Sequence, residues 1–169
     1  MAQTDWTRRR FMTTAASAAG LAAMPRLSAA IDESWQAGWW NQHQRLVKSL
    51  NAQKQRSGIV LSGDLHAIGH AALERSGDMD LSENPVHSVL TGTLGTQNGW
   101  PSDARGTPPQ TAIGLAHKTH SEVLEKNGFT LLDVTPDEVT IRLFAWKIEE
   151  PVEAIDSLGP YHTYTIKRG

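Results

Sequence analysis

The sequence contains no cysteine among its 169 residues. That absence excludes thiol catalysis, cysteine-ligated zinc, iron–sulfur clusters and any disulfide framework. The chain also lacks an excess of positive charge, because 16 Lys and Arg side chains stand against 18 Asp and Glu, for a net charge of −2. A nucleic-acid-binding domain needs a basic face that neutralises phosphates, so we expect no nucleic-acid partner.

Long hydrophobic runs are missing as well. The apolar stretch Ala15–Met24 is rich in alanine and has about half of the roughly 20 residues that a membrane-spanning helix needs. We therefore expect no stable membrane span.

The first thirty residues have the pattern of an export signal. A basic start is followed by a short apolar stretch and by small residues at 28–30, which is typical of a cleavable signal peptide. Arg8 and Arg9, followed by Phe11, resemble the twin-arginine signal. We expect residues 1–30 to direct the chain to the periplasm or the extracellular space; the alternative is a basic N-terminus with a chance arginine run.

The remaining residues have the pattern of one α/β domain. Apolar residues at helical spacing predict a helix over Asp32–Gln55, with Trp35, Trp39, Trp40, Leu46, Val47 and Leu50 as its buried stripe. The continuous apolar run Ile59–Leu61 predicts a buried strand. The later elements are predicted as a strand at Val86–Leu90, a long loop at 95–110, a short helix at Ala116–Lys126, a hairpin of Phe129–Val134 and Val139–Trp146, and a last strand at His162–Ile166.

The most informative segment is Gly63-Asp64-Leu65-His66, directly after the first predicted strand. Loops at the carboxyl ends of strands carry the chemistry of open α/β sheets. Asp64 and His66 offer a carboxylate and an imidazole to one ion, a combination that suits zinc, manganese or iron. We expect Gly63 to permit a sharp turn and a close backbone approach. The alternative is an ordinary turn in which the Asp64 side chain is hydrogen-bonded.

Five other histidines have simpler interpretations. His70 follows His66 by four residues, and we expect it to be a polar loop or strand residue rather than a ligand. His87 and His162 fall within strand patterns, and we expect hydrogen-bonded structural roles for both. His117 and His120 lie on the short predicted helix near Glu122, where a solvated face is favoured over a small metal site.

The chain resembles the alkaline phosphatase D (PhoD-like) family of the metallophosphoesterase group. The segment Ile59–His66 resembles the last metal-binding motif of that family, and the resemblance extends over roughly residues 35–166. The other matching segments are Trp39-Trp40-Asn41-Gln42 with Leu46-Val47, Ser88–Thr96, Trp100–Gly106, Asn127–Val134 and Val139–Leu143.

The resemblance implies a partial metallophosphoesterase-like sandwich, corresponding to the C-terminal half of the family's catalytic domain. It implies that Asp64 and His66 are metal ligands and that residues 31–169 derive from a phosphatase domain. Enzymes of the group hold two metals through an upstream Asp-x-His, a Gly-Asp and a Gly-Asn-His. The only Asp-x-His here is Asp64-Leu65-His66, and Gly-Asn-His is absent. We therefore expect the chain to be inactive alone.

Three functional hypotheses follow. The first is an exported phosphoric ester hydrolase segment that acts on phosphomonoesters or phosphodiesters, with Arg105 in the long loop as a candidate contact for the phosphate. The second is a split enzyme in which a partner chain supplies the missing ligands. The third is a secreted binding module without catalysis.

Overall fold

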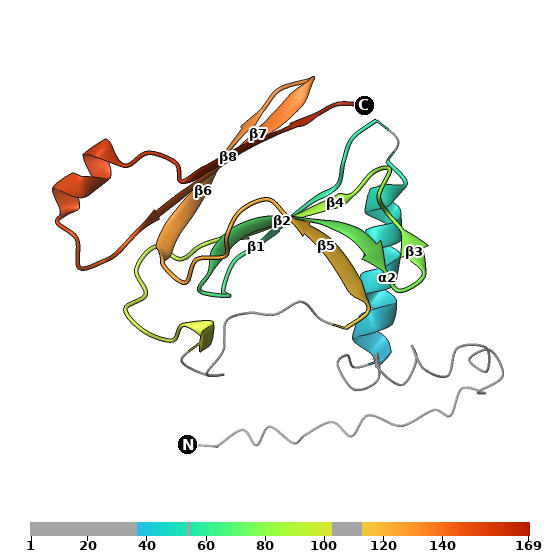
Figure 1. Cartoon of the computed structure of the whole chain (residues 1–169), viewed down its shortest axis with the longest axis horizontal. Coiled ribbons are helices and arrows are strands. Elements are labelled where there is room, and N and C mark those ends of the chain that lie inside the picture. Colours follow the sequence, from blue (N-terminus) through green and yellow to red (C-terminus); the bar gives the residue numbers. More distant parts are fainter. Residues whose placement is uncertain (1–36, 54, 103–112) are drawn as a thin grey trace, which may run out of the picture.

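The computed structural model describes residues 37–53, 55–102 and 113–169 (Figure 1). The predicted signal residues Arg8, Arg9 and Phe11, together with Trp35 and Arg105, lie outside the described residues. Among the residues that are described, no helix is long and apolar enough to cross a membrane.

The described chain is mixed α/β, with mostly strands and one α-helix. Its elements are, in order, α2 (Ala37–Asn51), β1 (Ile59–Ser62), β2 (Ile68–Ser76), β3 (Met79–Asp80), β4 (Val86–Thr91), β5 (Leu115–Thr119), β6 (Asn127–Val134), β7 (Glu138–Trp146), the 3₁₀ helix η1 (Val152–Ser157) and β8 (His162–Lys167).

The strands form two sheets. The first has the order β1-β4-β2-β3, with β5 also paired to β2; β1 and β4 are parallel, and the other pairs are antiparallel. The second is an antiparallel sheet of order β6-β7-β8. Because β1 and β4 are parallel, their carboxyl ends meet at one edge of the first sheet.

Two apolar cores occupy the two faces of the first sheet. One core joins α2 to the sheet through Val47, Leu81 and Val86. The other lies between the two sheets and consists of Ile68, Val89, Ile141, Leu143 and Ile166. Val86 and Val89 are an odd number of residues apart on β4, so they point to opposite faces. The molecule therefore has three layers: helix, first sheet and second sheet (Figure 1).

Most predicted elements are present, and three predictions about them are wrong. The strand predicted at Ile59–Leu61 is present as β1, but it is not buried, because it lies at the edge of the first sheet and Leu61 is 49% exposed. The predicted helix at Ala116–Lys126 is absent. The strand β5 forms there instead, because its backbone pairing with β2 outweighs a weak local helix pattern. The predicted stripe on α2 is only partly buried, since Val47 is buried but Trp39 is 66% exposed and Leu46 is 52% exposed. The strands β2 and β3 were not anticipated from the sequence.

Candidate functional site

The loop that carries Asp64 and His66 follows β1 at the edge where β1 and β4 end. Thr91, the last residue of β4, donates a hydrogen bond from its Oγ1 to the carbonyl of Ser62, at 3.1 Å, and so ties the two strand ends together. This is the location that the sequence predicts for the loop.

Asp64 and His66 both have left-handed backbone conformations, with φ of 66° and 49°. Such angles are uncommon for residues other than glycine, although Asp and His adopt them more readily than most. Backbone strain of this kind costs about 1–3 kcal/mol and is concentrated at functional sites. The expectation for Gly63 was wrong: the positive φ angles fall on Asp64 and His66, and a Cβ at Gly63 would lie 3.9 Å from the nearest atom, Thr91 Oγ1.

The His66 ring is held in place by a backbone carbonyl. Its Nδ1 lies 2.9 Å from the carbonyl oxygen of Gly99, and because a carbonyl only accepts, Nδ1 carries the proton and donates. The lone pair is then on Nε2. A ring N–H bound to a carbonyl, with the opposite nitrogen available, is the usual arrangement of a metal-ligating histidine. Trp100 packs edge-on against the ring, at 6.3 Å between centroids.

The loop carries two potential metal ligands. Asp64 is exposed and His66 is half-buried. Within the described part of the chain, neither belongs to a group of three or more His, Asp or Glu side chains that are close enough to share an ion. The geometry therefore orients one potential donor, the His66 imidazole, and the exposed Asp64 carboxylate lies two residues before it on the same loop.

A second cluster of potential ligands lies between the sheets. The histidine cluster consists of His70 on β2, His87 on β4, His120 just after β5 and His162 on β8. His70 is at its centre: its Nε2 lies 2.9 Å from His87 Nδ1, and its Nδ1 lies 3.3 Å from His162 Nε2. The His120 ring stacks on the His70 ring, at 4.7 Å between centroids.

Strand alternation brings these histidines together. His70 shares a strand face with Ile68, His87 with Val89, and His162 with Ile166, and all three partners belong to the core between the sheets. His120 is fixed by its backbone N–H, which donates to the carbonyl of His70 at 2.9 Å. The imidazoles therefore extend the apolar core between the sheets.

Burial keeps these imidazoles neutral. Desolvation, together with the neighbouring histidines, lowers the pKa of His70 to about 3 and that of His87 to about 4. The pKa values of His120 and His162 are also lowered, first by burial. Neutral imidazole is the form that binds metals. Ligand atoms of His70, His87 and His120 lie within 4.8 Å of one another, so this triad can hold a metal ion.

The histidine cluster is not predicted above, although strand alternation in the sequence indicates part of it. The hydrogen-bonded role expected for His87 is confirmed, but its partner is another histidine. His117 and His120 do not share a helical face: His117 is exposed on β5, and His120 is half-buried beyond its end. Alternation within Val86–Leu90 and within His162–Ile166 already places His87 and His162 on core-facing positions. The missing information was the strand β2, which carries His70.

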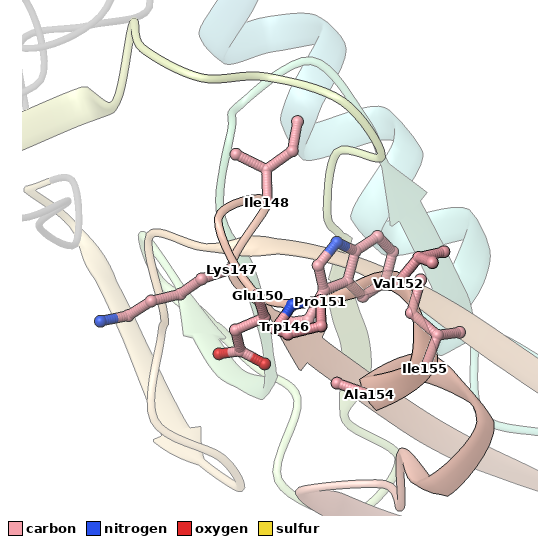
Figure 2. A pocket seen from close by; sticks show the side chains of 8 residues that line it. All are labelled: Trp146, Lys147, Ile148, Glu150, Pro151, Val152, Ala154 and Ile155. Atoms are coloured by element: carbon pink, nitrogen blue, oxygen red, sulfur yellow. The ribbon is translucent and has the colours of Figure 1, made fainter.

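A shallow hollow of about 180 Å³ lies near η1, and none of the residues that line it belongs to either set of ligands. Its lining is mainly apolar, and Figure 2 shows Trp146 beside Val152, with the Lys147 ammonium group pointing away. It contains one carboxylate, Glu150, and no histidine. The hollow therefore offers a single carboxylate as a potential metal ligand.

Comparisons with protein-family models, with curated proteins and with solved structures find no match to this chain.

Proposed function

We propose that this chain carries the terminal metal-binding loop of a PhoD-like phosphoric ester hydrolase, with Asp64 and His66 as metal ligands. The observation that carries the proposal is the hydrogen bond from His66 Nδ1 to the carbonyl of Gly99, at 2.9 Å, which leaves Nε2 as the donor atom. The left-handed backbone at both residues adds support, because strain of this kind marks functional loops.

The chemistry of the site is metal-assisted hydrolysis of a phosphomonoester or phosphodiester. Metal ions about 3.5–4 Å apart generate a nucleophilic hydroxide and stabilise the entering and leaving oxygens of an in-line displacement. Asp64 and His66 supply one carboxylate and one imidazole, which suit manganese, zinc or iron. Two side chains do not hold two ions, so this loop is one part of a complete centre.

The exposed surface of α2 supports the hypothesis that a partner chain supplies the remaining ligands. Trp39 is 66% exposed and Leu46 is 52% exposed. They are seven residues apart and so lie on the same side of the helix. Large apolar side chains grouped on a surface are typical of an interaction site. We infer that the chain functions as a subunit of an exported phosphatase and that it has little or no turnover alone.

Binding of inorganic phosphate to the manganese-loaded protein tests this function. We expect Mn²⁺ bound to the full chain to broaden the phosphorus NMR signal of phosphate, because an anion coordinates the open positions of the ion. Asp64→Asn combined with His66→Gln should abolish the protein-dependent part of the broadening. Asp156→Asn and His117→Gln, which change exposed residues of the same types, should retain it.

Two results would overturn the metal-binding role of the loop, and a third would overturn the need for a partner. Protein-dependent broadening that persists in the Asp64→Asn/His66→Gln variant would place the ion elsewhere. Absence of broadening with the unmodified chain would favour a secreted binding module without phosphatase chemistry. Turnover of a chromogenic phosphodiester by the chain alone, lost in the same variant, would show that the centre is complete and that no partner is needed.

A further inference from the structure

We propose that His70, His87 and His120 form a zinc site between the two sheets and that His162 is a positioning residue for it. The site shares no ligand with the Asp64 loop and comes from different elements. It therefore stands whether or not the proposed phosphatase function holds.

The donor set selects the class of metal. The three neutral imidazoles offer nitrogen lone pairs. The triad includes no carboxylate oxygen and no thiolate sulfur. Magnesium and calcium require oxygen ligands, whereas zinc binds histidine nitrogen readily and is found with three histidines and a water. Among the common biological ions without redox chemistry, zinc fits this donor set best.

The spacing of the nitrogens is close to what zinc needs. Zn–N distances of about 2.0–2.1 Å imply nitrogens about 3.4 Å apart around a tetrahedral ion. The ligand atoms of the triad lie within 4.8 Å of one another, and His70 Nε2 is 2.9 Å from His87 Nδ1. The rings therefore need only shifts of about 1 Å to surround an ion at that geometry.

His162 completes the arrangement around His70. When His70 Nε2 faces the ion, its Nδ1 carries the proton and donates to His162 Nε2, 3.3 Å away. A ligating histidine almost always donates its second ring nitrogen to such a partner, which fixes the tautomer and the ring orientation. His162 lies on β8, so it ties the second sheet to ligands that belong to the first.

The site has one closed side and one side near solvent. His70 is 1% exposed and His87 is 3% exposed, whereas His120 and His162 are half-buried. Tyr164 packs against the His120 ring, at 4.2 Å between centroids, and against the rings of His70 and His87. An ion can therefore enter past His120, and we place a water molecule on its fourth position at that side.

Zinc content and cobalt substitution test the site. Both experiments use the full chain with the added changes Asp64→Asn and His66→Gln, which remove the potential donors of the Asp64 loop. After chelation and dialysis against Zn²⁺, we expect one zinc ion per chain by mass spectrometry. Co²⁺ in its place should give the strong visible absorption of a tetrahedral nitrogen site. His120→Gln should lose both signals, and His117→Gln, two residues before β5 ends, should keep both.

The positioning role of His162 has a separate readout. His162→Gln should retain tetrahedral cobalt absorption but weaken zinc affinity about 10- to 100-fold. Equal zinc content in the parent and in His120→Gln would overturn the site, as would an octahedral cobalt spectrum. Circular dichroism in the presence of chelator checks that His120→Gln folds; if it does not, the affinity of His162→Gln decides, and an unchanged value contradicts the proposal.

Discussion

His66 and His70 are four residues apart in the sequence, yet their rings meet different kinds of partner. The His66 ring donates to a backbone carbonyl at 2.9 Å and is half-buried. The His70 ring is 1% exposed, and among the described residues its two nitrogens meet the imidazoles of His87 and His162. The first arrangement fixes one histidine toward solvent, and the second creates a group of neutral donors inside the protein.

The stability of the metal-free protein should fall as the pH drops below about 6.5. Unfolded histidines take up protons near that pH, whereas burial lowers the pKa of His70 to about 3 and that of His87 to about 4 in the folded state. The unfolded state therefore binds more protons, and stability present above about pH 6.5 is lost progressively toward those values. The other ionisable groups that act on the cluster are His120, His162, Tyr164, Lys118 and Glu74.

Urea unfolding in the presence of chelator, at about pH 7.5 and at about pH 5, measures this effect. Both pH values lie above the range in which carboxylates titrate strongly. We expect a clearly lower midpoint at the acidic pH, and the same difference in the His117→Gln control. A midpoint that does not change between the two pH values would contradict the buried, neutral state of His70 and His87.

The junction between the two sheets depends on a pair of glycines. Gly92 follows β4 with φ of +85°, and a Cβ there would lie 2.8 Å from the carbonyl oxygen of Gly128. Thr93 and Asn127 form an isolated bridge beside it, and the Gly128 N–H donates to the Thr93 carbonyl at 2.9 Å. The end of β4, which is next to the Asp64 loop, is thus fixed to the start of β6.

Gly92→Ala should destabilise the protein by about 2 kcal/mol, because the new methyl group meets backbone and the left-handed angle strains an alanine. Gly95→Ala is the matched control, since nothing lies within 4 Å of a Cβ at that position; its effect should stay within about 0.5 kcal/mol. Chemical denaturation of both variants checks the difference, and equal stabilities would show that the junction tolerates a side chain.

The elements that the sequence predicts well are those with strong local patterns. Ile59–Leu61 is an apolar run, Val86–Leu90 has apolar residues on both sides of His87 and Ser88, and the hairpin β6–β7 has a turn signal between two alternating strands. The strand β2 has the sequence Ile68–Ser76, with two alanines and several polar residues, and its conformation is set by pairing with β3, β4 and β5. Such long-range pairing is not visible in a local pattern.

The candidate sites differ in the same way. Asp64 and His66 are two residues apart, so a short motif after a strand was enough to select them. The histidine cluster joins residues up to 92 positions apart, His70 and His162, and requires the register of both sheets. The helix predicted at Ala116–Lys126 also hid the contact of His120 with the other histidines. A helix there could not pair with β2, and this pairing brings His120 close to His70.

The two sheets are held together by a small apolar core on which the histidine cluster depends. Leu143 and Ile141 on β7 are fully buried and contact Ile68 and Val89 of the first sheet. Among the described residues this core has five members, four with 0% exposure and Ile166 with 9%, so the loss of one large side chain removes much of it.

Leu143→Ala should therefore cost about 2–5 kcal/mol, the range for removing a buried leucine side chain. Leu131→Ala is the control, because Leu131 lies on β6 of the same sheet but is 44% exposed; we expect a loss under about 1 kcal/mol. The midpoints of urea unfolding compare the two. Similar losses would indicate that the inter-sheet core does not carry the stability of the molecule.

Mapping of bound Mn²⁺ by NMR tests most directly whether Asp64 and His66 hold a metal ion. Mn²⁺ favours oxygen-containing ligand sets over a purely nitrogen one, so it distinguishes the loop from the histidine cluster. We predict that low Mn²⁺ broadens the amide signals of Gly63 to His66 and of Gly99 first, and that Asp64→Asn/His66→Gln removes this effect. Broadening that is centred elsewhere, or that is unchanged in the variant, would contradict the metal-binding role of the loop.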